Sequence, residues 1–470
     1  MTIIISGGTV VEASGSFRGD VIVEGSTISA IAAPDSALVE AAGRGDAEII
    51  DATGCYVIPG GVDVHVHLQL PMSPEAVSSD TFTTGTRAAA LGGTTTVIDF
   101  AGQLKGTSVR AALDERLAEA EGACCIDYGF HLSMGDVHEQ SLADMRSLID
   151  EGLTSFKLFM AYPGAWYSDD GQILRAMQVA AETGAMIMMH AENGIAIDVL
   201  REQAAARGNI GAVWHGRTRP PELEGEATHR AVQLAAVAGA PLYIVHLSAA
   251  EALEQVMHAR DRGRNVFAET CPQYLHLSLE EHLDQPGLDG IRHICSPPLR
   301  LRADRHQETL WSGLRNDDLS VVSTDHCPFC DKEKLLGIDD FRNVPNGLGT
   351  IEHRMDLLYQ GVVTGELTLP RWVELCATTP ARLFGLQGRK GVLSPGADAD
   401  VVIYDPSVEH VLGVETHHMQ LDHSAWEGMA ITGKTRTVLS RGQVVVRDHE
   451  FVGRSGHGRY LQRSLPDPLR

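Results

Sequence analysis

The stretch Gly60-Gly61-Val62-Asp63-Val64-His65-Val66-His67 places two histidines, two positions apart, in a run with the apolar alternation of a β-strand. Side chains at positions i and i+2 of a strand point to the same side, so both imidazoles can reach one metal ion. Paired histidines are also common on protein surfaces, and the motif alone is a weak sign of a metal site. Its meaning depends on the rest of the chain.

Seven further apolar or β-rich runs follow this one, and helix-patterned segments rich in Ala, Leu, Glu and Arg separate most of them. Such an alternation predicts a (β/α)8 barrel, with an active site at the carboxyl ends of its strands. A doubly wound open sheet is the alternative, but no glycine-rich nucleotide-binding motif follows a strand. The eight runs are 56–68, 94–101, 125–134, 155–160, 186–190, 241–248, 265–271 and 319–325.

Three later runs also carry, at or near their ends, a side chain that can bind a metal ion, namely His190, His246 and Asp325. Taken singly, each is more typical of a buried polar group that is satisfied by its neighbours. Together with His65 and His67 they place four histidines and a carboxylate at four predicted strand ends of one barrel. This combination indicates a metal site.

Lys157 lies in the middle of the apolar run Thr154-Ser155-Phe156-Lys157-Leu158-Phe159-Met160. A buried ammonium is costly unless it is paired, so an ion pair with Asp325, or a surface position, is one interpretation. Burial also lowers the pKa of a lysine amine. A neutral amine can take up carbon dioxide and become a carbamate, which is a carboxylate that can bridge two metal ions. The residues alone leave both interpretations open.

Long, ordered motifs along nearly the whole chain resemble the cyclic amidohydrolases, and within them the dihydropyrimidinase and hydantoinase family. The resemblance implies hydrolysis of the ring amide of 5,6-dihydropyrimidines or 5-substituted hydantoins to N-carbamoyl amino acids. It also implies a TIM-like barrel beside a β-sandwich, and a homotetramer. The motifs include GGVDVHVHL, TGTRAAALGGTTTVIDF, SFKLFMAY, HAENG, PLYIVHLS, ETCPQYL, SPPLR, STDHCPF, PNGLGTIEHRM and PARLFGL.

The resemblance further implies two divalent metal ions, with Zn²⁺ the expected metal, although manganese, cobalt or nickel suits the same ligands. His65, His67 and Asp325 would bind one ion, and His190 and His246 would bind the second. The lysine, carboxylated, bridges both ions. The set is His65, His67, Lys157, His190, His246 and Asp325.

The same resemblance implies a mechanism with a metal-bridging hydroxide as the nucleophile. Asp325 would act as general base and then as general acid, and Tyr162 would bind substrate and stabilise the oxyanion. Ser296 and Asn346 match positions that hold the cyclic substrate, mainly through backbone groups. Without the resemblance, both would be ordinary turn residues.

Four apolar side chains are candidates for a lid over the ring substituent: Leu70, Met72, Phe159 and Trp166. After His67 the sequence reads LQLPMSPEAVSSDTF, where dihydropyrimidinases usually carry a Phe-Met-Gly-Thr-like run. This departure weakens the case for dihydrouracil and pyrimidine catabolism, and allantoinase or another cyclic amidohydrolase stays an alternative. A non-catalytic dihydropyrimidinase-like scaffold is the alternative from another class, but here every ligand position is occupied.

Both chain ends are rich in short strands, and neither end is long enough to form a sheet with its own core. We therefore expect residues 1–53 and 386–450 to form one β-sandwich domain. Residues 54–385 would form the metal-dependent barrel, and residues 451–470 a tail that serves as a subunit-contact arm.

The composition excludes several classes of partner. The 470 residues carry 38 Lys+Arg against 62 Asp+Glu, a formal net charge of −24, and such a surface repels nucleic-acid phosphates. No secretory leader is evident and no apolar run reaches the roughly 18 residues of a membrane span. Eight cysteines in this context favour reduced thiols. We expect a cytoplasmic protein with a small-molecule substrate and no nucleic-acid or membrane partner.

Overall fold

Eight parallel strands lie side by side in chain order and form the predicted barrel in this computed structural model, which describes residues 1–34, 36–43 and 45–467. The N–H of His67 donates to the carbonyl of His326 (2.8 Å), so the chain just after the first strand contacts the segment that follows the last. The strands are β8 (Gly61–Val66), β11 (Thr94–Gln103), β12 (Asp127–Met134), β13 (Ser155–Phe159), β14 (Met186–His190), β15 (Leu242–Ile244), β16 (Val266–Thr270) and β17 (Val321–Val322).

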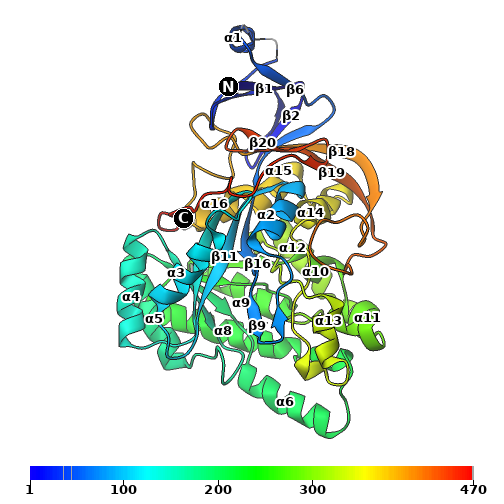
Figure 1. Ribbon diagram of the computed structural model, residues 1–470. Coiled ribbons are helices and arrows are strands. Elements are labelled where there is room, and N and C mark those ends of the chain that lie inside the picture. The colour runs from blue at the N-terminus through cyan, green and yellow to red at the C-terminus, as the bar shows by residue number, and fades with distance from the viewer. Residues whose placement is uncertain (35, 44, 468–470) are drawn as a thin grey trace.

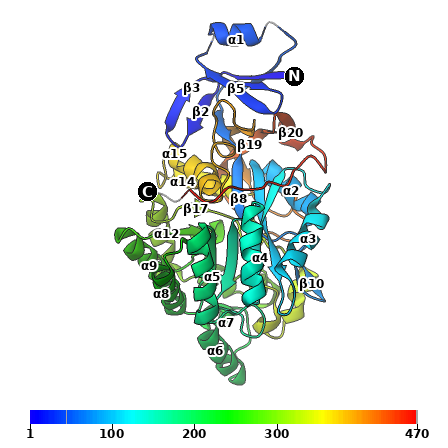
Figure 2. The same cartoon turned by 90° about the vertical axis from the view of Figure 1, so that its left-hand side faces the viewer.

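Helices surround the barrel (Figure 2). The longer ones are α2 (Phe82–Leu91), α3 (Val109–Ala120), α4 (Glu139–Asp150), α5 (Asp170–Thr183), α6 (Gly194–Ala206), α8 (Pro221–Ala238), α9 (Ala250–Asp261), α12 (His306–Arg315) and α14 (Arg354–Val363). The shorter ones are α7 (Val213–Arg217), α10 (Pro272–His276), α11 (Gly287–Ile291), α13 (Asp331–Lys334), α15 (Leu369–Val373) and α16 (Thr379–Leu383). The short helix α1 (Ala37–Ala42) lies instead on the sandwich (Figure 1).

Local sequence sets the ends of these helices, as α5 illustrates. The Asp169 side chain accepts the N–H of Gln172, and the Gln172 side chain accepts the N–H of Asp169, which is a capping box. Gly184, at φ 84°, ends the helix in the left-handed conformation that glycine adopts without strain.

Both ends of the chain build the β-sandwich, as predicted, and it lies at one end of the molecule (Figure 1). Its core combines N-terminal residues such as Ile3 and Val21 with C-terminal residues such as Val401 and Leu439. One sheet has the order β5 (Thr27–Ala32), β4 (Asp20–Glu24), β1 (Thr2–Ser6), β6 (Glu48–Asp51). The other has the order β21 (Glu450–Phe451), β20 (Gln443–Arg447), β19 (Ala430–Ser440), β18 (Val401–Val411), β7 (Tyr56–Pro59), β2 (Thr9–Glu12), β3 (Gly15–Arg18).

The run 56–68, expected to be one barrel strand, is divided between the two domains. Its first part, β7, pairs with β18 in the sandwich, and only the part from Gly61 onward enters the barrel as β8. The division falls at Gly60, where a Cβ atom would lie 2.1 Å from the Thr95 hydroxyl oxygen, so only glycine fits. Residues 56–59 therefore lie with the sandwich and not with the barrel, and the other domain limits remain our proposal.

The C-terminal segment packs on the chain's own barrel. Leu461 donates its N–H to the carbonyl of Tyr128 (2.8 Å), and the buried Arg463 donates to the hydroxyl of Ser155 (2.9 Å). Residues 468–470 of the tail lie outside the described residues. A role of the tail as a subunit-contact arm stays a prediction.

The carboxyl ends of the barrel strands face away from the sandwich. The helix α6, which follows β14, lies at the end of the molecule opposite the sandwich in both views (Figures 1 and 2). The small hairpin of β9 (Pro71–Ser73) and β10 (Ala76–Val77), which follows β8, extends the same way (Figure 1). Within the described ranges, none of the helices combines the length and apolarity that a membrane crossing requires.

Candidate active site

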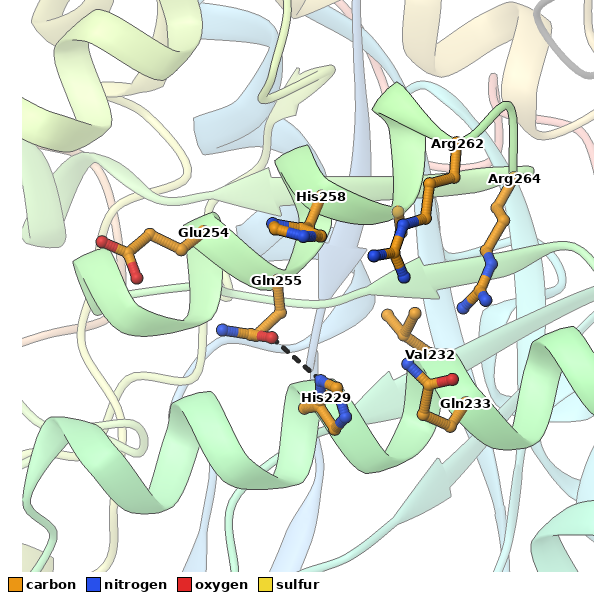
Figure 3. A pocket seen from close by; sticks show the side chains of 9 residues that line it. His229, Val232, Gln233, Glu254, Gln255, His258, Arg262 and Arg264 are labelled. Carbon is orange, nitrogen blue, oxygen red and sulfur yellow. Dashed lines mark hydrogen bonds between the residues drawn. The ribbon is translucent and has the colours of Figure 1, made fainter.

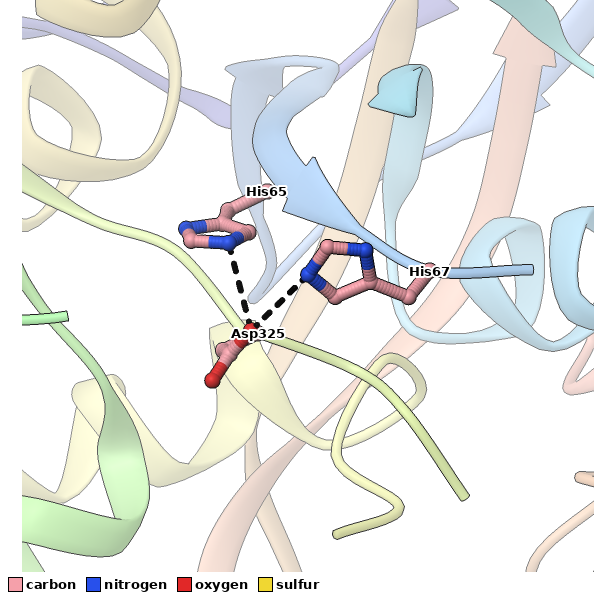
Figure 4. A group of neighbouring side chains, drawn as sticks. All are labelled: His65, His67 and Asp325. Carbon is pink, nitrogen blue, oxygen red and sulfur yellow. Dashed lines mark ion pairs between the residues drawn. The ribbon is translucent and has the colours of Figure 1, made fainter. Parts of the chain in front are cut away.

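Three of the predicted ligands meet at the carboxyl end of the barrel (Figure 4). His65 and His67 come from the end of β8, and Asp325 comes from the segment after β17. The Asp325 Oδ1 atom lies 3.2 Å from His65 Nε2 and 3.3 Å from His67 Nε2. Although burial raises the pKa of Asp325, the two imidazoles lower it to about 2, so the carboxylate is charged. The three ligand atoms are close enough together to hold one metal ion.

The other two predicted histidines lie beside this group. His190 is the last residue of β14, and His246 follows β15 by two residues. Their ring centroids are 4.5 Å apart, and the His246 ring lies 5.4 Å from that of His65. Both side chains are buried, and four imidazoles from three strands therefore lie next to one another.

Lys157 joins these groups from the centre of β13. Its Nζ atom lies 2.9 Å from His65 Nε2, the same nitrogen that faces Asp325, and its side chain is buried. Burial lowers the pKa of the Lys157 amine to about 8, although Asp325 and Glu269 act in the opposite direction. A substantial fraction of this amine is therefore neutral at mildly alkaline pH.

The donor set fits divalent metal ions. The Nδ1 atom of His246 is buried and has no hydrogen-bond partner among the described residues. Burial also lowers the pKa of His65 and His246 well below the usual range. Neutral imidazoles offer lone pairs, and together with a carboxylate they form a ligand set typical of zinc.

Two buried glutamates that the sequence interpretation missed hold the ligands in place. Glu269, at β16, contacts Nδ1 of His65 and accepts a hydrogen bond from the Tyr243 hydroxyl (2.9 Å). Glu192 lies 2.8 Å from Nε2 of His190. A carboxylate on the second nitrogen of a ligating histidine fixes the tautomer and the ring orientation. The signal in the sequence was an acidic residue at or just after an apolar run, in ETC and HAE.

The predicted substrate-binding residues lie together beside the histidines. The Tyr162 ring is 5.1 Å from that of His190, and Asn346 Nδ2 donates to Ser296 Oγ (3.1 Å). Burial raises the pKa of Tyr162, while the Ser296 hydroxyl lowers it, so the phenol keeps its proton. A cavity of about 230 Å³ borders Tyr162 and Arg219.

Backbone strain is concentrated at this site. Tyr162 (φ 60°), His246 (φ 40°) and Asp325 (φ 50°) adopt left-handed conformations, which are costly for residues other than glycine. The surrounding packing holds all three in place. Such strain is typical of positions where a side chain must be aimed for function.

The four lid candidates do not form a single group. Phe159 and Trp166 pack together with ring centroids 5.4 Å apart, and the Phe159 ring stacks on His190. Leu70 packs instead against a small cluster that contains Cys327 and Phe329. Met72, on β9, is 47% exposed. A lid built from these residues stays a prediction, and its part nearest the histidines is Phe159 with Trp166.

Two other features lie outside this site. A surface depression of about 320 Å³ between α8 and α9 is lined by polar side chains such as His229 and Gln255, on the outer helical layer (Figure 3). A second group of possible metal ligands includes Asp331 and His423, but Arg292 already binds the Asp331 carboxylate with two nitrogens. Neither feature resembles the group of buried histidine, aspartate and lysine side chains at the carboxyl end of the barrel.

A parallel barrel that brings four histidines and an aspartate from its strand ends together with a lysine from the centre of a strand defines a metal-dependent hydrolase. The family model described as the amidohydrolase family matches residues 56–445. A D-hydantoinase of Streptomyces coelicolor is 55% identical over 98% of this chain and 98% of its own. Solved structures of a Bacillus sp. D-hydantoinase (46% identity, TM-score 0.94, covering 99% of this chain and 100% of that one) and of a Brevibacillus agri dihydropyrimidinase (44%, 0.96, 100% of both) are similar. The chain belongs to the amidohydrolase family and, within it, to the hydantoinases and dihydropyrimidinases.

Proposed function

We propose that this protein hydrolyses the ring amide bond of 5-substituted hydantoins or 5,6-dihydropyrimidines and releases N-carbamoyl amino acids. The observation that carries the proposal is the convergence of His65, His67 and Asp325 beside Lys157. The relatives named above as hydantoinases and a dihydropyrimidinase support the same substrate class. We favour hydantoins, because the loop after His67 departs from the dihydropyrimidinase pattern.

The proposed cofactor is a pair of divalent ions, expected to be zinc. His65, His67 and Asp325 would hold one ion, and His190 and His246 the other. When bound, the ions polarise the scissile carbonyl group and lower the pKa of water enough to supply a nucleophile near neutral pH.

We propose that Lys157 contributes to both ion sites as a carbamate. Its neutral amine nitrogen adds to the carbon of carbon dioxide, which forms one C–N bond and releases one proton. The product is a carboxylate on the lysine arm. Two observations support this carbamate: burial lowers the pKa of the Lys157 amine to about 8, and the Lys157 Nζ atom lies 2.9 Å from His65 Nε2.

The remaining steps belong to this chain's own side chains. Asp325 accepts the proton of the attacking water and delivers it to the leaving ring nitrogen. Tyr162 keeps its proton and donates a hydrogen bond to the oxyanion of the tetrahedral intermediate. Ser296 and Asn346 bind the polar edge of the ring, and Phe159 would contact the substituent.

We further propose a homotetramer in the cytoplasm. Support for the compartment comes from the eight cysteines, none of which is paired in a disulfide within the described part of the chain. The family resemblance supports the tetramer.

Ring preference is tested by comparing kcat/KM of the zinc-loaded protein for 5-phenylhydantoin, dihydrouracil and allantoin. We expect the arylhydantoin to exceed dihydrouracil by at least about tenfold, because the apolar rings of Phe159 and Trp166 beside His190 would favour a large apolar substituent. A lead for dihydrouracil would instead assign the protein to pyrimidine breakdown, and a lead for allantoin would make it an allantoinase. No turnover of any ring with metals bound would contradict the proposal.

A further inference from the structure

Lys334, the last residue of α13, is buried, and its hydrogen bonds all go to main-chain carbonyl groups. Its ammonium group donates to the carbonyls of Ile294 (3.1 Å), Pro345 (2.9 Å) and Gly347 (2.9 Å). A lysine ammonium has three donors and no acceptor, so every donor is used. Lys334, at the end of α13, thus links the segment at Ile294 to the segment at Pro345 and Gly347, about fifty residues further along the chain.

Burying this charged group opposes folding. Burial lowers the pKa of the Lys334 amine to about 8, and among the described residues the Cys295 and Cys327 thiols oppose this shift but no carboxylate does. A buried charge without a counter-ion is retained only when its hydrogen bonds are complete. Removing the amine would leave three buried carbonyl groups with fewer partners.

The segments tied by Lys334 carry the two residues expected to bind the ring. Ile294 precedes Ser296 by two positions, and Pro345 and Gly347 flank Asn346. The same segments also contact each other, because Gly347 donates its N–H to the Ile294 carbonyl (2.9 Å) and Asn346 donates to Ser296 (3.1 Å).

Close packing leaves these segments little room to adjust. A Cβ atom at Gly347 would lie 2.1 Å from the Cys327 carbonyl oxygen, and one at Gly337 would lie 2.4 Å from the Val344 nitrogen. The turn after Lys334 therefore packs directly on the segment that carries Asn346. The hydrogen bonds from Lys334 therefore fix the positions of these segments, in addition to the packing of its side chain.

We propose that Lys334 is a positioning residue for the substrate. It fixes the main chain on both sides of Asn346 and just before Ser296, so that polar groups from two separate loops face one cyclic imide together. This role rests on the proposed function. Recognition of a small rigid ring requires donors and acceptors to be held within about 0.5 Å, which two independent loops do not achieve.

The test is Lys334→Met, which keeps most of the volume and removes all three donors. For 5-phenylhydantoin we expect KM to rise by about tenfold, as for the loss of one good hydrogen bond, with kcat changed far less. Lys334→Gln, with two donors, should lie between. Bound metal should be unchanged, and hydrogen exchange at residues 294–297 and 345–348 of the metal-free protein should accelerate.

Two matched substitutions serve as controls. Lys332→Met alters a lysine whose side chain is 80% exposed and should change nothing. Lys390→Met alters a buried lysine paired with Asp127 and Asp400, and it should lower the melting temperature without raising KM. If Lys334→Met does not fold, Lys334→Gln carries the test.

The outcomes separate this role from the proposed function. Wild-type turnover with an unchanged KM in the Lys334 variants overturns the positioning role alone. A loss of kcat together with lost metal also overturns it, because it assigns Lys334 to general stability. A wild-type protein that opens no ring overturns the proposed function, whatever the exchange rates of the two loops.

Discussion

We expect Asp325→Asn to lower kcat for ring opening by about 10³-fold, within the usual range for a lost general acid and base. One oxygen of Asp325 faces both His65 and His67, which leaves the other free to move a proton. Asparagine keeps the shape of the side chain but neither carries the charge nor accepts the proton. The measurement is kcat for 5-phenylhydantoin per metal-loaded chain.

The control for this substitution is Asp289→Asn, at a side chain that is 73% exposed on α11. It should leave kcat and bound metal at wild-type values. An Asp325→Asn protein that binds metal normally and keeps more than a tenth of wild-type kcat contradicts the proton-transfer role.

Lys157→Met removes the amine that lies between the two groups of histidines. We expect the variant to bind at least one ion fewer and its kcat to fall by about 10³-fold or more. Methionine fills the space, so the barrel should still fold. Metal is counted by mass spectrometry. Wild-type protein equilibrated with ¹³C-bicarbonate should show a carbamate carbon signal that the variant lacks.

Lys334→Met is the matched control, because both lysines are buried and both have a pKa lowered by burial to about 8. It should keep its metal and the carbamate signal. A fully active, metal-loaded wild-type protein with a free Lys157 amine would rule out the bridging role.

The cluster of predicted metal ligands was visible in the sequence because parallel barrel strands are buried and read as apolar runs. His190 is the last residue of its strand, and His246 and Asp325 follow their strands by two or three residues. Strand order then brings these ends to one mouth. The positions of five side chains therefore followed from pattern and topology.

The supporting residues could not be found in this way. Glu269 meets His65 across 204 residues, and Lys334 binds carbonyls that any loop possesses. A pattern of burial does not reveal which polar atoms face each other. Trp166 illustrates the same limit, because its position follows from packing against Gly102, where a Cβ atom would lie 2.9 Å from the indole.

The central claim is a dinuclear metal site that opens cyclic amides. It is tested most directly by adding zinc stepwise to metal-free protein while ring opening of 5-phenylhydantoin is followed and bound zinc is counted. We predict that turnover is absent without metal and reaches its maximum at two ions per chain. Full turnover with one ion or none, or two bound ions with no ring opened, would contradict the account.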